Sequence, residues 1–161
     1  MNWQQVCDDP LLRDLPYKIE LNEWGNIVMS PATSRHGMLQ GLIQNALRAI
    51  RQDGLVFPEC PIQTAKGVKV PDVVWASGAF LREHAASSPF LRAPELCVEV
   101  MSPANSMREM EEKRELYFAR GAQEVWLCDE QGALAFHDCT GPIPVSSLFP
   151  GISRIDSEYI H

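Results

Sequence analysis

Apolar and polar positions along the chain follow two periodicities, one typical of strands and one typical of helices. Short apolar or alternating stretches predict strands, at residues 17–21, 27–29, 68–75, 95–101, 125–128 and 133–137, with short extended pieces at 56–57 and 62–64. Apolar residues at helical spacing, ending in the stripe Leu39, Ile43, Leu47 and Ile50, predict a helix from about Arg35 to Arg51. A second helix is predicted over residues 107–120, before Gly121, and a short one within residues 77–94.

This order of elements predicts an α/β fold with a mixed central β-sheet flanked by helices and additional N-terminal strands. The 161 residues fit a single domain, 1–161, in which residues 1–16 are a polar lead-in segment broken by Pro10 and Pro16. No repeat or low-complexity run divides the chain.

Composition excludes several classes of protein. The five cysteines are scattered without a Cys-x-x-Cys pair, which argues against a zinc framework or a disulfide framework. The N-terminus lacks the basic start and apolar run of a signal sequence, and charges interrupt the apolar stretches, so we expect a cytoplasmic protein with no membrane segment. A net charge of −7 argues against a surface that binds nucleic acid electrostatically everywhere. Any contact with DNA must therefore be local, metal-assisted or both.

Two carboxylates stand inside apolar runs that read as buried strands, Asp72 and Glu99. An unpaired buried carboxylate costs several kcal/mol, so the fold is expected to supply a cation to both. If the two strands are neighbours, both carboxylates can face one side and hold Mg²⁺, with the backbone carbonyl of Val100 completing the site. The alternatives are a Pro-Asp turn for Asp72 and a solvent-facing strand position for Glu99.

The second helix places Glu109, Lys113 and Tyr117 within one arc, since they are spaced by four residues. A lysine near a metal and two carboxylates can position an attacking water or neutralise charge on a phosphate. Glu109, one turn earlier, can pair with Lys113 or take a metal-bound water. The alternatives are a solvated charged face for Lys113 and a core position for Tyr117.

An ordered set of motifs is similar to that of the Uma-two-type restriction endonucleases, a group of the PD-(D/E)XK nuclease superfamily. The resemblance covers roughly residues 15 to 155 and rests on Pro71-Asp72, Cys97-Val98-Glu99-Val100-Met101-Ser102-Pro103, Glu109-x-x-x-Lys113-x-x-x-Tyr117, Gly121-x-x-Glu124-Val125-Trp126-Leu127 and Ser147-Leu148-Phe149-Pro150-Gly151. It implies a restriction-endonuclease-like core with Asp72 and Glu99 as metal ligands and a lysine completing the site. Met101 occupies the lysine position of the Glu-x-Lys pattern, so the resemblance assigns that role to Lys113.

The resemblance also singles out the first helix. His36 corresponds to a histidine typical of the family, and Gln40 follows it by one turn. Either side chain can touch a metal-bound water or a phosphate, while the alternative for His36 is a structural role at the helix start.

These observations predict an endonuclease that uses Mg²⁺ or Mn²⁺ to hydrolyse DNA phosphodiester bonds and that pairs as a homodimer. Asp72 and Glu99 bind the metal and Lys113 assists the attack of water. The alternative is a nuclease-fold binding or regulatory module without catalysis, which the −7 charge and Met101 favour. A third possibility is hydrolysis of another phosphodiester, such as RNA or a nucleotide.

Overall fold

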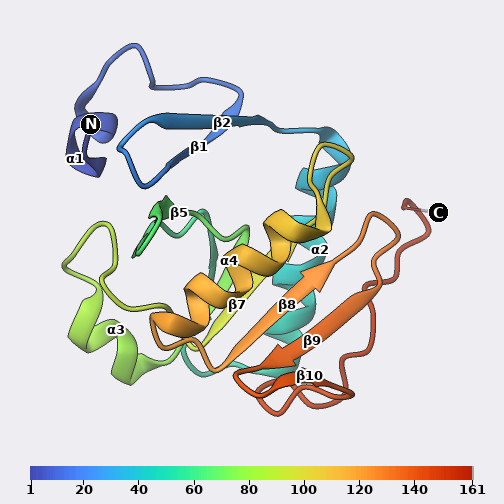
Figure 1. The fold of residues 1–161 in the computed structure, drawn as a ribbon. Coiled ribbons are helices and arrows are strands. Elements are labelled where there is room, and N and C mark those ends of the chain that lie inside the picture. The colour runs from blue at the N-terminus through green and yellow to red at the C-terminus, as the bar shows by residue number, and fades with distance from the viewer. Residues whose placement is uncertain (161) are drawn as a thin grey trace.

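The computed structural model describes residues 1–160 and has a six-stranded sheet at its centre (Figure 1). The strands of this sheet are β3 (Leu55–Pro58), β6 (Val73–Ala76), β7 (Leu96–Val100), β8 (Glu124–Cys128), β9 (Leu134–Asp138) and β10 (Gly141–Ile143). Their order is β10-β9-β8-β7-β6-β3, with β7 and β8 parallel and the other neighbours antiparallel. The predicted mixed sheet is therefore confirmed.

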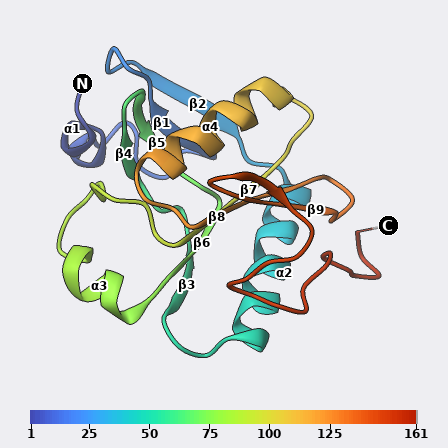
Figure 2. The same cartoon turned by 60° about the horizontal axis from the view of Figure 1, so that its bottom comes forward.

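Two helices cover opposite faces of this sheet, α2 (Ser34–Ile50) and α4 (Met107–Ala119) (Figures 1 and 2). On the α2 face, the apolar stripe of the helix packs against Val98, Trp126 and Phe149. On the α4 face, Tyr117 packs with Cys97 and other buried residues. Successive residues of β7 thus face different helices, as strand pleating requires.

Both helices begin at a hydroxyl cap. The Thr33 side chain accepts a hydrogen bond from the backbone N–H of His36, and the Ser106 side chain accepts one from that of Glu109. These caps place the first turns of both helices at the same end of the central strands. The predicted helices are confirmed within one residue at each end.

A smaller unit covers that end of the sheet. It contains α1 (Trp3–Asp8) and two hairpins, β1 (Tyr17–Leu21) with β2 (Ile27–Pro31) and β4 (Ile62–Thr64) with β5 (Gly67–Lys69). Three of their buried apolar side chains, Val6, Leu21 and Val68, form a separate cluster, while Ile62 of β4 packs with Tyr117 and Cys97. The predicted lead-in segment thus includes a short capped helix, which buries only Val6 and so has no helical periodicity to detect.

The two hairpins meet closely at Gly67. This residue has a φ of +84°, and a Cβ built there would lie 2.2 Å from the carbonyl oxygen of Leu21. Glycine is therefore required both by the backbone conformation and by the close approach of β1.

The strand predicted over residues 68–75 is wrong as one continuous element, because it is interrupted between β5 and β6. Pro71 has no N–H to donate, while the N–H of Val70 binds the Glu20 side chain at 2.8 Å and that of Asp72 binds the carbonyl of Val98 at 3.0 Å. The chain passes here from the small unit into the central sheet. Asp72 consequently lies directly before β6, next to β7.

The remaining helix is α3 (Gly78–His84), the short helix expected within residues 77–94. Across residues 1–160, no helix combines the length and apolar character needed to cross a membrane.

Candidate active site

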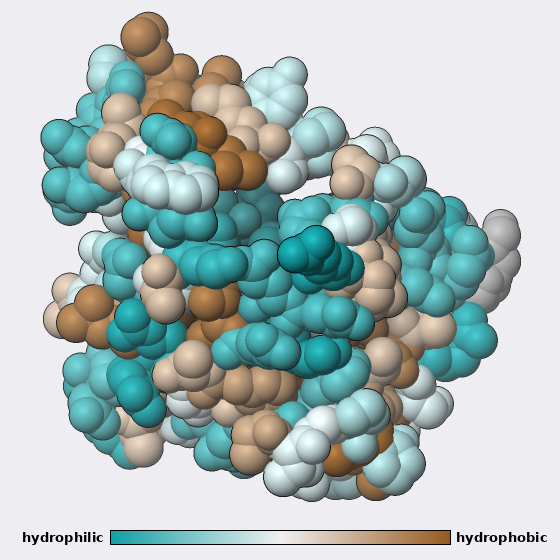
Figure 3. Space-filling model, viewed as in Figure 1, coloured by the Kyte–Doolittle hydropathy of each residue, from teal (hydrophilic) through white to brown (hydrophobic). Residues whose placement is uncertain are grey.

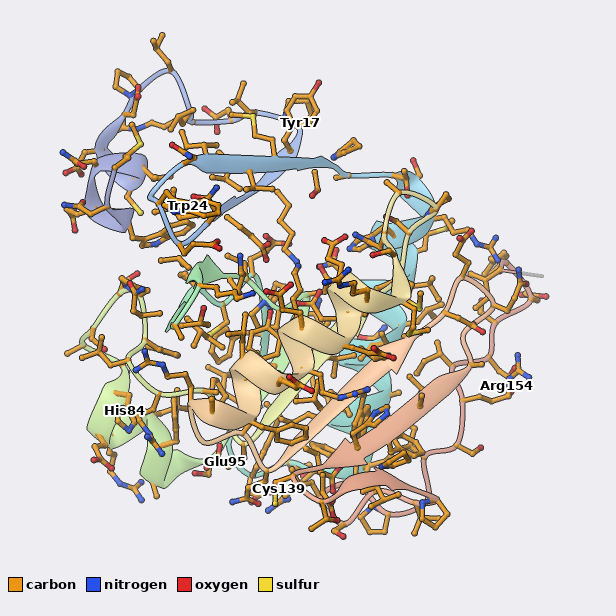
Figure 4. All side chains as sticks on the ribbon, in the orientation of Figure 1. Tyr17, Trp24, His84, Glu95, Cys139 and Arg154 are labelled. Carbon is orange, nitrogen blue, oxygen red and sulfur yellow. The ribbon has the colours of Figure 1, made fainter. Side chains whose placement is uncertain are left out.

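A polar cavity of about 250 Å³ lies between the β1–β2 hairpin, the ends of β6 and β7, and the start of α4. Charged and amide side chains line much of it, namely Lys18, His36, Gln40, Glu59, Asp72, Glu99, Asn105 and Lys113. Figure 3 shows a hydrophilic hollow beneath the hairpin, and nitrogen and oxygen atoms crowd the same region in Figure 4. Tyr17, next to Lys18 on β1 and labelled in Figure 4, also lines the cavity.

Asp72 is held by three donors and is only 1 % exposed. Its Oδ1 accepts hydrogen bonds from Lys18 Nζ at 2.9 Å and His36 Nε2 at 3.0 Å. Its Oδ2 accepts the backbone N–H of Val100 at 2.7 Å. Burial alone would raise the pKa of Asp72, but Lys18 and His36 outweigh burial and hold the pKa well below its ordinary value. Asp72 is therefore ionised.

Glu99 lies beside Asp72 because β6 and β7 pair, and it is equally buried. Its Oε1 accepts the hydroxyl of Tyr117 at 2.5 Å and lies 3.7 Å from Lys113 Nζ. Its Oε2 lies 3.6 Å from Lys18 Nζ. Burial raises the pKa of Glu99 to about 7, since the two lysines only partly offset the loss of hydration and Asp72 adds repulsion.

Lys113 enters the cavity from α4 and meets a third carboxylate, Glu20 of β1. Lys113 Nζ donates to Glu20 Oε1 at 3.0 Å, and the same oxygen accepts the N–H of Val70. Burial would lower the pKa of Lys113, but the charges of Glu99 and Glu20 raise it above the ordinary value. Lys113 is therefore a cation and supplies positive charge to the cavity rather than a base.

The sequence did not predict a role for Lys18, which the structure places between Asp72 and Glu99 in the cavity. Its ammonium contacts both Asp72 and Glu99, and their charges raise its pKa above the ordinary value despite burial. Lys18 and Glu20 are two residues apart in a strand with apolar Ile19 and Leu21. This alternation places Lys18 and Glu20 on one face of β1, which was the available signal for their role. A charged face of a two-stranded hairpin usually faces water, so the signal did not point to a site.

The other predicted residues divide between the cavity and its surroundings. His36 contacts Asp72, and its pKa is raised by this hydrogen bond. Gln40 donates to the backbone carbonyl of Asp72 at 3.0 Å, and Val100 contributes its N–H to the same residue. Glu109 instead accepts a hydrogen bond from the Asn105 side chain, so the predicted contact with Lys113 is replaced by the Lys113–Glu20 pair.

Met101, at the lysine position of the Glu-x-Lys pattern, lies outside this cavity. It lines a second, more apolar cavity between α4 and strands β8 and β9. The two lysines of the candidate site are Lys18 of β1 and Lys113 of α4, and neither lies on β7 with Glu99.

The donor set fits a hard divalent cation held mainly by water. Within residues 1–160, no three His, Cys, Asp or Glu side chains are gathered as ligands of one ion. Asp72 Oδ1 and Glu99 Oε2 nevertheless face one shared positive charge, the Lys18 ammonium. Mg²⁺ typically binds through one or two carboxylates and keeps several waters, so these two oxygens and the Val100 carbonyl suit it better than they suit zinc.

Comparison with known proteins bears on the family and the fold. The family model Uma2, described as "Putative restriction endonuclease", matches residues 9–138, well over half of the chain. The structure is similar to a crystal structure described as a "putative nuclease belonging to DUF820" from Anabaena variabilis, with a TM-score of 0.64 and 19 % sequence identity over 84 % of this chain and 85 % of that chain. No curated protein gives a significant match. The likeness confirms the predicted nuclease-type α/β core.

Proposed function

The chain belongs to the Uma2 family, and from this premise we propose that it is a metal-dependent endonuclease that hydrolyses DNA phosphodiester bonds. Membership of a family described as restriction endonucleases supports nuclease activity. The observation that carries the finer proposal is the pair of oxygens, Asp72 Oδ1 and Glu99 Oε2, that share one cation in a polar cavity.

Asp72 and Glu99 are the proposed metal ligands, with Mg²⁺ or Mn²⁺ as the ion. His36 and the N–H of Val100 fix the orientation of Asp72, and Tyr117 fixes that of Glu99. Each carboxylate thus has one oxygen directed at the shared cation. When bound, a divalent ion supplies charge neutralisation at the phosphate and makes a nearby water more acidic.

Lys113 is the proposed group that stabilises the reacting phosphate. Hydrolysis forms a bond between a water oxygen and phosphorus and breaks one phosphorus–oxygen ester bond, with the leaving oxygen taking up a proton. Negative charge grows on the phosphate oxygens in the transition state. A protonated Lys113, held by Glu20, stabilises that charge and orients the water by hydrogen bonding.

DNA is the proposed substrate, and a homodimer is the proposed assembly. The net charge of −7 means that one copy offers little general attraction for a polyanion. Two copies can present two sites to the two strands, and light scattering of the protein in solution tests this part of the proposal.

The test is cleavage of supercoiled and linear DNA with Mn²⁺ or Mg²⁺, together with calorimetric titration of the metal. Asp72→Asn removes one ligand charge while keeping the size of the side chain, and Lys66→Met is the control, because Lys66 pairs with Glu112 at an exposed position. We expect metal binding and nicking to be lost together in Asp72→Asn and kept in Lys66→Met. Nicking that survives in Asp72→Asn would contradict the proposed site.

A second candidate is a nuclease-fold binding or regulatory module without catalysis. One observation favours it: the two proposed ligands already have a cation in Lys18 and do not need a metal for charge balance. Such a module would bind neither Mn²⁺ nor Mg²⁺, and its affinity for its partner would survive Asp72→Asn.

A further inference from the structure

Lys18 occupies the position in which a metal ion would be expected. Of the four carboxylate oxygens of Asp72 and Glu99, Asp72 Oδ2 accepts the Val100 N–H and Glu99 Oε1 accepts the Tyr117 hydroxyl. The other two oxygens, Asp72 Oδ1 and Glu99 Oε2, lie 2.9 Å and 3.6 Å from Lys18 Nζ, and Asp72 Oδ1 also lies 3.0 Å from His36 Nε2. The ammonium therefore bridges the oxygens that remain for a metal.

A metal and this ammonium exclude each other. Mg²⁺ binds carboxylate oxygens at about 2.1 Å. An ion bound to both of these oxygens would therefore need the space that the Lys18 ammonium occupies between them. Two cations at such a distance repel strongly in a buried site. Resting on the function proposed above, we propose that Lys18 is an intramolecular competitor of the metal, which binds only by displacing the Lys18 ammonium.

The structure provides room for the displaced side chain. Lys18 has a flexible four-carbon stem, its side chain is 13 % exposed, and it lines both the active-site cavity and a neighbouring one beside α1. Glu59 lines the same two cavities and offers a carboxylate outside the Asp72–Glu99 pair. A rotation of the Lys18 side chain toward Glu59 would take the ammonium away from both metal-facing oxygens, while His36 stays on Asp72 Oδ1.

The exchange has two measurable consequences. Without metal, Lys18 is the cation that Asp72 and Glu99 share, so its loss leaves the two buried carboxylates without it. With metal, the same loss removes the competitor. Removing the lysine should therefore weaken the metal-free fold and strengthen metal binding.

The experiment compares wild type, Lys18→Met, Lys18→Arg and Lys66→Met. Calorimetric titration with MnCl₂ measures affinity, and thermal unfolding in EDTA and in MnCl₂ measures stability without reference to cleavage. Lys66→Met changes the net charge by the same amount at an exposed pair and serves as the control. We expect Lys18→Met to bind Mn²⁺ at least about tenfold more tightly than wild type and to melt at a lower temperature in EDTA, with the largest gain on adding Mn²⁺.

Lys18→Arg keeps the charge and, because guanidinium binds carboxylates through two N–H groups, should bind Mn²⁺ no more tightly than wild type. It tests the idea even if Lys18→Met does not fold without metal. Equal or weaker Mn²⁺ binding in Lys18→Met, or tighter binding in Lys18→Arg, would overturn the competition while leaving the proposed nuclease intact. If neither wild type nor Lys18→Met binds Mn²⁺, the proposed function fails and the competition fails with it.

Discussion

Two buried glutamates on adjacent parallel strands, Glu99 of β7 and Glu124 of β8, have opposite kinds of partner. Glu124 is 2 % exposed and accepts four hydrogen bonds from neutral donors. These donors are Trp126 Nε1, Ser146 Oγ and the backbone N–H groups of Ser147 and Leu148, at 2.7–3.0 Å. Glu99 has one neutral donor, the Tyr117 hydroxyl, and two lysines at 3.6–3.7 Å beside a cavity.

The difference is the one we expect between a structural carboxylate, Glu124, and the proposed metal ligand, Glu99. Fixed backbone and indole donors satisfy Glu124 and tie the segment after β10 to the sheet. Long cationic side chains satisfy Glu99 and can leave it. Burial alone does not distinguish the two residues, whereas the chemical identity of their partners does.

The largest difference between the two glutamates is expected in activity. Glu99→Gln should lower the rate of Mn²⁺-dependent plasmid nicking by at least about 100-fold, because a ligand charge at the reacting phosphate is lost. Glu124→Gln should keep the rate per folded molecule close to wild type. Equal losses in the two variants would contradict the distinction.

The order of the two variants should be reversed for stability, with the larger loss in Glu124→Gln. In Glu124→Gln an amide NH₂ faces donors that previously met an oxygen, which should lower the free energy of unfolding by roughly 2 kcal/mol. Glu99→Gln in EDTA at pH 8 should leave it unchanged or raise it, because burial penalises the ionised form of Glu99. Urea unfolding monitored by tryptophan fluorescence measures both, and a greater loss in Glu99→Gln would argue against this view of Glu99.

The pH dependence of the metal-free protein follows from the raised pKa of Glu99, about 7 when folded against an ordinary value of 4.5. Between these values the unfolded chain loses the proton while the folded one keeps it, so stability falls as pH rises, by about 1.4 kcal/mol for each pKa unit of difference. The raised pKa of His36 acts in the same direction above pH 6.5. Glu99→Gln should flatten the decline between pH 5 and 7 in EDTA, whereas Glu124→Gln should retain it.

The smallest expected effects come from single hydroxyl donors. Tyr117→Phe removes the donor to Glu99, and Ser146→Ala removes one donor to Glu124. Each should cost about 1 kcal/mol of stability. Only Tyr117→Phe should also weaken Mn²⁺ binding, by about tenfold, because it orients a proposed ligand. Calorimetry on both variants is the check, and a similar loss in Ser146→Ala would remove the contrast.

Periodicity predicted the central architecture because strands and helices there are long and regularly patterned. Pleating predicted that Asp72 and Glu99 share a face if their strands are neighbours, and helical spacing predicted that Lys113 and Tyr117 lie on one arc of their helix. The structure pairs the two strands and brings that arc to Glu99. The structure brings all four together. The catalytic roles of Asp72, Glu99 and Lys113 and the supporting role of Tyr117 stay predictions.

The remaining parts of the site depend on contacts between distant segments. Lys113 pairs with Glu20, 93 residues away, and not with Glu109 on its own helix. Local spacing reveals that Lys18 and Glu20 share a face of β1, but only the docking of the hairpin shows what that face covers. The interruption of the predicted strand at Pro71 was not recognised, because valines before and after it continue the apolar pattern.

The close approach at Gly67 has a consequence for mutational tolerance. Any side chain there meets the Leu21 carbonyl and displaces β1, which carries Lys18 into the cavity and Glu20 to Lys113. In a saturation-mutagenesis screen for function, Gly67 would therefore score as intolerant as a catalytic residue, although it has no side chain with which to do chemistry. Intolerance at this position would report the placement of a hairpin rather than a role in the reaction.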